Sequence, residues 1–192
     1  MQKTSTEAKK ISSRKTELLR KGRLSIPYAR YFLTLTTKDR KKGLNESYIT
    51  KSLITTWREI HQSKDLEFHC GTVMPDHIHL LFTLGQRITL PQIVSKLKMH
   101  SKLPLKTKNI EWQANYFEHR LSPDTLMEPF SRYIFLNPYR KKLLPLNTSW
   151  SGWVIHKKYK PAFLDQLIDE QYPHPKWLST EPTLAEIIET EL

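Results

Sequence analysis

The sequence VMPDHIHLLF at residues 73–82 supplies one strand of a predicted β-hairpin, after a strand at 66–73 and the turn 74–76. Side chains alternate between the two faces of a strand, so His77 and His79 are expected side by side on one face. Two imidazoles in this arrangement converge on one cation and leave coordination positions for substrate oxygens. A surface strand with two solvated histidines is the plainer alternative.

Segments on both sides of this hairpin complete an ordered series of strands and helices. Besides the hairpin, we expect strands at 31–36 and 111–117 and helices at 46–63, 88–102 and about 123–144, the last kinked or broken by Pro129 and Pro138. Residues 147–154 add an edge strand or cover the core. The order predicts an α+β, ferredoxin-like (split βαβ) antiparallel sheet with helices packed on one face.

Length and composition indicate a single domain. With 192 residues the chain can bury one core without disulfides or metal ions as staples. Cys70 is the only cysteine, so no intrachain disulfide can form, and the chain suits a reducing cytoplasm. The amino terminus lacks the apolar segment of a signal peptide, and no apolar run approaches membrane-spanning length. We therefore expect a soluble, cytoplasmic protein.

Charge divides the chain into three parts. The formal net charge of +12 points to a polyanionic partner. We expect residues 1–24 to form a basic N-terminal arm, residues 25–160 the folded domain, and residues 161–192 an acidic C-terminal tail in which Lys176 is the only Lys or Arg. We hypothesise that the tail folds over the basic cleft and competes with nucleic acid for it. A solvated helix docked on the back of the sheet is the alternative.

A second stretch with chemically useful side chains is RYIFLNPYR at residues 132–140. Positions four apart share a helix face, so Tyr133 and Asn137 are expected to point the same way. The tyrosine is then a candidate nucleophile, and the amide oxygen of Asn137 is a candidate third metal ligand. Pro138 disfavours helical geometry at Asn137, which leaves that position to be set by function. A core tyrosine before an Asn-Pro helix end is the alternative.

Basic residues gather on the second predicted helix and after the tyrosine stretch. The expected DNA-binding residues are Lys96, Lys98, Lys102, Lys106, Lys108, Arg140, Lys141 and Lys142. A solvated helix face accounts for the first five equally well.

Three motifs together resemble a family. Met-Pro-Asp-His-Ile-His-Leu-Leu, then a Trp-Gln pair with Phe-Glu-His, then Tyr-Ile-x-x-Asn-Pro are similar to the REP-associated tyrosine transposases, relatives of the single-tyrosine HUH transposases. The resemblance runs from about residue 30 to residue 153 and leaves the acidic tail outside. It implies an HUH-type, metal-dependent endonuclease and strand transferase that acts on single-stranded DNA at a palindromic hairpin through a covalent 5′-phosphotyrosine.

The resemblance also assigns roles to residues. It implies a metal-binding pair at His77 and His79, the nucleophile at Tyr133, a polar metal-site residue at Asn137, and an accessory acidic-His pair at Glu118 and His119. A structural histidine is an alternative for His119. The chain departs from the family pattern by an arginine directly after that histidine, Arg120, and by lysines after Asn-Pro-x-Arg. These departures bear on substrate specificity and local packing more than on catalysis.

The implied chemistry agrees with the side chains. A divalent ion bridging the scissile phosphate oxygens would neutralise developing charge, and two imidazoles with an amide oxygen suit Mg²⁺ or Mn²⁺. Tyrosine has an unperturbed pKa of about 10. Tyr133 therefore needs deprotonation or a nearby cation, for which Arg140, Lys141 or the metal ion are candidates. The expected partner is single-stranded or hairpin DNA, bound by a monomer or homodimer.

Two other functions remain open from the sequence. One is a catalytically silent module that binds hairpin DNA or RNA. The other is a metal phosphodiesterase that uses an activated water, with Tyr133 structural.

Overall fold

The computed structural model describes residues 25–191. The expected basic arm at 1–24 lies outside the described residues. Within 25–191 no helix is both long and apolar enough to cross a membrane.

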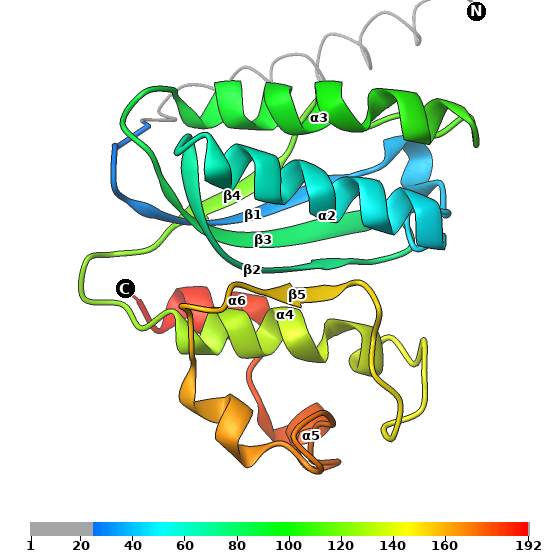
Figure 1. Cartoon of the computed structure of the whole chain (residues 1–192). Coiled ribbons are helices and arrows are strands. Elements are labelled where there is room, and N and C mark those ends of the chain that lie inside the picture. Colours follow the sequence, from blue (N-terminus) through cyan, green and yellow to red (C-terminus); the bar gives the residue numbers. More distant parts are fainter. Residues whose placement is uncertain (1–24, 192) are drawn as a thin grey trace, which may run out of the picture.

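A five-stranded antiparallel sheet forms the centre of the molecule (Figure 1), with the strand order β4-β1-β3-β2-β5. Its strands are β1 (Arg30–Thr36), β2 (Leu66–Val73), β3 (His77–Leu84), β4 (Phe117–Arg120) and β5 (Trp153–Ile155). The first four have the ferredoxin-like order, and β5 extends the sheet beside β2. The predicted fold class and hairpin are confirmed, and of the stretch 147–154 only its end forms an edge strand, as β5.

The fourth strand begins later in the chain than predicted. Residues 111–117 were expected to form it, but the strand pairs Phe117–Arg120 with β1. Trp112 forms an isolated bridge with Thr37, and the Gln113 N–H donates to the carbonyl of Thr36 at 2.9 Å. The segment therefore meets the end of β1 and leaves it again before β4 begins.

Helices cover both faces of the sheet, which corrects the prediction that they pack on one. Figure 1 shows α2 (Ser47–Gln62) and α3 (Leu90–Lys106) above the sheet and α4 (Glu128–Arg140) below it. Apolar side chains explain this arrangement, because β3 alternates between two cores. Leu80 packs toward α2 and α3, whereas Leu81 packs with Phe130 and Ile134 of α4.

The helix α4 is shorter than the predicted 123–144. The Arg30 guanidinium donates to the carbonyls of Ser122, Pro123 and Thr125, the last at 2.8 Å. These carbonyls are therefore held in a turn, and the helix begins at Glu128. It runs without a break to Arg140, with Pro138 in its last turn.

The described part of the acidic tail packs on α4. It contains a 3₁₀ helix (Ala162–Gln166), α5 (Trp177–Thr180) and α6 (Leu184–Glu189). Phe163 and Trp177 join Phe135 of α4 in an apolar cluster, and Ile187 packs with Phe130. Figure 1 shows α6 alongside α4, on the lower side of the sheet. Competition between the tail and nucleic acid stays a prediction.

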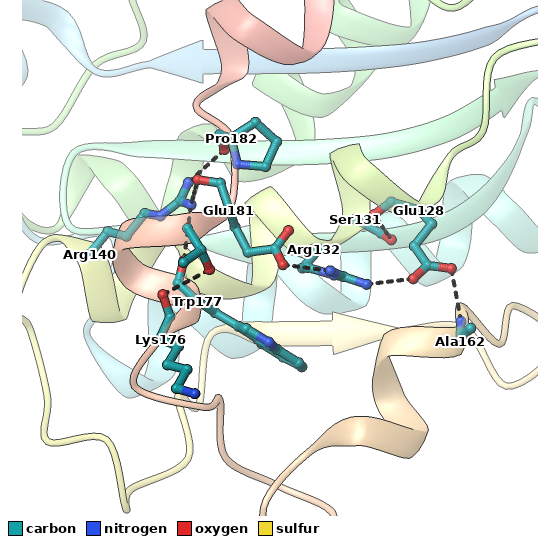
Figure 2. A network of polar contacts seen from close by, with 10 residues as sticks. Glu128, Ser131, Arg132, Arg140, Ala162, Lys176, Trp177, Glu181 and Pro182 are labelled. Carbon is teal, nitrogen blue, oxygen red and sulfur yellow. Dashed lines mark hydrogen bonds and ion pairs between the residues drawn. The ribbon is translucent and has the colours of Figure 1, made fainter.

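Polar contacts reinforce this docking (Figure 2). Arg132 donates to Glu128 at 2.8 Å and to Glu181 at 2.7 Å. Arg140 donates to the backbone carbonyls of Glu181 at 2.6 Å and Pro182 at 3.0 Å. Both arginines of α4 are thus bonded to the segment that leads into α6.

Candidate active site

The two histidines of β3 lie side by side on the face that α4 covers. The centres of their rings are 4.7 Å apart. Both are buried, with His77 9% and His79 4% exposed, while Ile78 between them points into the opposite core. The predicted alternation places them as expected, but not on a solvated surface.

Hydrogen bonds on both ring nitrogens fix the tautomer of His79. Its Nε2 accepts from the Asn137 side-chain amide at 3.1 Å, so the proton of the neutral ring is on Nδ1. That Nδ1–H donates to Thr34 Oγ1 at 2.9 Å. Burial lowers the pKa of His79 well below its ordinary value, and the charges of His77 and Arg40 lower it further. The ring therefore stays neutral and carries its lone pair on Nε2.

Asp76 orients the other histidine. The Nδ1 of His77 donates to Asp76 Oδ1 at 2.6 Å, which leaves Nε2 as the nitrogen with a lone pair. Burial lowers the pKa of His77, although Asp76 opposes this effect. Burial alone would raise the pKa of Asp76, but the bond to His77 and the charges of His77 and Arg40 outweigh it, so the pKa is lowered. The Nη1 atom of Arg40 lies 3.5 Å from Oδ2 of Asp76.

Tyr133 reaches the same site from α4. Its ring centre lies 5.6 Å from that of His79 and 6.0 Å from that of Phe32. Asn137, one helical turn later, is 4% exposed and contacts His79. Burial raises the pKa of the Tyr133 phenol, opposed by a hydrogen bond with Asn137 and the charge of Arg140. The structure thus brings together both histidines, the tyrosine and the asparagine.

The acidic-His pair on β4 does not join this group in the described structure. His119 stacks on Phe130, with ring centres 5.6 Å apart, and its Nε2 is hydrogen-bonded to the side chain of Glu191 from the tail. Glu118 lies opposite Leu33, a residue of the α2 and α3 core. Because neighbouring side chains alternate, Glu118 and His119 face opposite sides of the sheet. An accessory role for either residue stays a prediction.

Several lysines expected to bind DNA have intramolecular partners. Lys96 pairs with Asp65 at 2.6 Å, and Lys108 pairs with Glu46 at 2.9 Å. Lys98 donates to the carbonyls of residues 113 and 114, at 2.5 and 3.0 Å. Lys102, Lys106, Lys141 and Lys142 are exposed. DNA contact by any of them stays a prediction.

The donor set fits a small divalent cation. Among residues 25–191 no three His, Cys, Asp or Glu side chains form a metal-binding group, so an ion here would take two imidazoles and an amide. Both Nδ1 atoms are held by Asp76 and Thr34, and this outer support directs both Nε2 lone pairs into the site. To bind the ion, the Asn137 side-chain amide would have to turn, so that its oxygen faces the site where its N–H now contacts His79.

Comparison with known families agrees with this geometry. A family model described as "Transposase IS200 like" matches residues 25–135, which include both histidines and Tyr133. The chain belongs to the IS200-like transposase family. Members of this family are enzymes, and the predicted resemblance is confirmed at this level.

Two proteins show how far the likeness to other transposases extends. A candidate REP-associated tyrosine transposase of Haemophilus influenzae is 22% identical over 144 residues, or 68% of this chain and 81% of that protein. A solved REP-associated tyrosine transposase bound to a REP hairpin has a TM-score of 0.57 and 20% identity, covering 68% of this chain and 79% of that one. At this identity the solved structure supports the fold.

Three residues around the histidines of this transposase were not singled out by sequence patterns. Asp76 directly precedes His77, and an acidic neighbour of a candidate ligand is a readable signal for an orienting carboxylate. Thr34 meets His79 only through the register of β1 with β3. Arg40 lies in a loop whose return toward Asp76 has no local sequence signature.

Proposed function

We propose that the chain is a metal-dependent tyrosine transposase that cuts and rejoins single-stranded DNA beside a palindromic hairpin. The convergence of Tyr133 and Asn137 from α4 on two neutral histidines of β3 is the observation that carries this proposal. A related solved transposase is bound to a REP hairpin, which supports hairpin DNA as the substrate class.

His77 Nε2, His79 Nε2 and the Asn137 amide oxygen would hold the ion, with Mg²⁺ or Mn²⁺ as the best match to these ligands. When bound, such an ion neutralises charge on the phosphate oxygens and holds them in position. Thr34 and Asp76 would keep both rings in the tautomer that offers Nε2.

Tyr133 would act as the nucleophile. Its oxygen forms a bond to phosphorus while the 3′-oxygen leaves, which yields a 5′-phosphotyrosine and a 3′-hydroxyl. A 3′-hydroxyl can later attack the phosphotyrosine and release Tyr133, so the strand is rejoined without another energy source. Because burial raises the pKa of the phenol, its proton must be removed during attack, and the leaving 3′-oxygen takes up a proton to become the hydroxyl. The hydrogen bond from Asn137 and the charge of Arg140 favour the phenolate.

The test uses a labelled DNA hairpin with single-stranded flanks, taken from the DNA bordering the gene and incubated with Mn²⁺. We expect a covalent protein–DNA adduct that survives denaturing electrophoresis and is lost in Tyr133→Phe. Tyr139→Phe is the matched control on the same helix, because the hydroxyl of Tyr139 donates to the carbonyl of Thr148 at 3.0 Å. Cleavage without an adduct would favour a hydrolase using activated water. Binding without cleavage would favour a silent binding module.

A further inference from the structure

Two segments with exposed cations lie at the end of the sheet that carries His77. The loop after β1 reads KDRKK at 38–42, with four cations and one carboxylate. Lys141 and Lys142 follow the last turn of α4 and are also exposed. Figure 1 shows the link between β1 and α2 and the C-terminal end of α4 at the same, right-hand end of the molecule. We call this surface the basic end: Lys38, Arg40, Lys41, Lys42, Lys141 and Lys142.

The loop is fastened to the turn that leads into His77. The Thr37 N–H donates to the Asp76 carbonyl at 2.9 Å, and the Gly43 N–H donates to the Pro75 carbonyl at 2.8 Å. Arg40 lies 3.5 Å from Asp76, the carboxylate that orients His77. The loop is therefore a fixed neighbour of the candidate active site.

The second segment is fastened to the other side of the site. The Lys141 N–H donates to the carbonyl of Asn137 at 3.0 Å, so the lysine directly follows the turn that carries the asparagine. Arg40 of the loop and Lys141 after α4 therefore lie next to the candidate site on two different elements, one beside Asp76 and the other one turn after Asn137.

The charge of the basic end is only partly compensated within the molecule. Lys38 lies 3.5 Å from Glu111, and Arg40 faces Asp76. Lys41 instead donates to the neutral carbonyl of Asn109 at 3.0 Å. Lys42 and Lys141 are exposed, so they retain charge for an external anion. On α3, by contrast, Lys96 is taken up by the buried carboxylate of Asp65.

The backbone of the basic end adopts a costly conformation. Asp39, Arg40 and Lys142, each with a φ of 54°, are three of the eight non-glycine residues with positive φ among residues 25–191. Such a conformation costs a residue other than glycine on the order of 1–3 kcal/mol and tends to occur at ligand-binding sites. Asp39 and Arg40 lie in the 3₁₀ turn after β1, and Lys142 lies two residues after the end of α4.

We propose that the basic end is the phosphate-binding surface along which the single-stranded DNA next to the hairpin reaches His77, His79 and Tyr133. This inference rests on the proposed function for the identity of the strand. Whatever the identity of the strand, its phosphates contact the 38–42 loop and the lysines after α4, and they do not contact the outer face of the α2 and α3 layer.

The experiment compares two charge reversals at equal change in net charge. Lys42→Glu with Lys141→Glu alters one exposed lysine in each segment of the basic end. Lys51→Glu with Arg58→Glu alters two exposed cations on α2, on the other side of the sheet. The probe is fluorescently labelled oligothymidylate in EDTA, with binding measured by anisotropy over a series of salt concentrations. Phosphate contacts carry no sequence information, so this probe reports them without a known target.

We expect the basic-end variant to weaken binding by about tenfold or more at low salt and to reduce the log–log salt slope by about 1.4, since each lost single-strand phosphate contact removes about 0.7. The α2 variant should retain most of the affinity. The charge-conserving variant Lys42→Arg with Lys141→Arg should bind about as well as the wild-type protein. Equal loss in the two charge-reversal variants, or unchanged binding in the basic-end variant, would overturn the inference. Urea unfolding of each variant separates lost contacts from lost fold.

The probe is bound but not cut in EDTA, so the result does not depend on Tyr133. A wild-type protein that binds through the basic end yet forms no adduct with the hairpin would overturn the proposed function and leave the phosphate surface standing. A wild-type protein that forms the adduct while both charge-reversal variants bind equally well would overturn the surface alone.

Discussion

The two faces of the sheet are built from the same strands but filled with different chemistry. On the α2 and α3 face, β3 contributes Ile78 and Leu80 to a core of aliphatic and aromatic side chains. On the α4 face it contributes His77 and His79, which are buried with Asn137. Buried polar groups must be hydrogen-bonded to avoid a cost in stability, and each such bond contributes only about 0.5–1.5 kcal/mol net, so these residues add little to the stability of the fold. Both faces have apolar cores, but only the α4 face adds this buried polar group, so we expect the first face to matter mainly for stability and the second mainly for activity.

Substitutions at two adjacent residues of β3 should give the largest effects, and they test the difference between the two faces most directly. Leu80→Ala should lower the free energy of unfolding by about 2–5 kcal/mol, as expected for a buried leucine, while the folded fraction keeps forming the adduct. His79→Ala should reduce adduct formation more than about a hundredfold, because changing the outer partners of a metal ligand already costs about 10–100-fold. Urea titration and adduct yield measure the two effects. Similar losses of stability and activity in both variants would contradict the division between the faces.

The outer partners of the histidines give the next effect. Thr34→Val and Asp76→Asn should each weaken Mn²⁺ binding by about 10–100-fold, because the rings lose the bonds that direct Nε2 into the site. Electron paramagnetic resonance of free Mn²⁺ measures this without any DNA. Thr83→Val is a matched control, since Thr83 Oγ1 is 2.8 Å from His69 Nε2, outside the candidate site. Equal weakening in Thr83→Val would show that the effect is general to the fold.

Lowering the pH should reduce the free energy of unfolding through buried histidines on the α4 side of the sheet, because these rings are neutral in the folded state. Burial lowers the pKa of His69 to about 4 and that of His79 well below its usual value. The unfolded chain takes up protons near pH 6.5 while these folded rings do not, so stability is lost as pH falls below about 6.5. For His69 the loss should continue down to about pH 4. Urea titrations of wild type and His69→Gln should show a shallower decline in the variant, and parallel curves would contradict it.

The positions of β1, β2 and β3 could be predicted from sequence periodicity because hairpin and strand signals are local, whereas β4 lies later in the chain than predicted. Placement of α4 on the opposite face was missed, since that choice depends on which apolar side chains of β1, β2 and β3 remain uncovered. The histidine, tyrosine and asparagine positions could be named from the sequence because they occur in short motifs. Thr34 could not, because its contact with His79 depends on strand register. Arg140 was expected to face DNA, yet it donates to the tail backbone, a contact between segments over 40 residues apart.

The smallest expected effect concerns how α4 is held from its outer side. Glu181 accepts from Arg132 at 2.7 Å, and both side chains are about one-fifth exposed. Glu181→Gln should lower the free energy of unfolding by about 1 kcal/mol, because a charge-assisted hydrogen bond becomes a neutral one and Arg132 keeps Glu128. Glu189→Gln on α6 is the exposed control and should have little effect. Because Arg132 precedes Tyr133 on α4, adduct yield below the unfolding transition also reports whether the tail positions the helix. An unchanged yield would show that the tail contact affects only stability, although it lies on the same side of the sheet as the candidate active site.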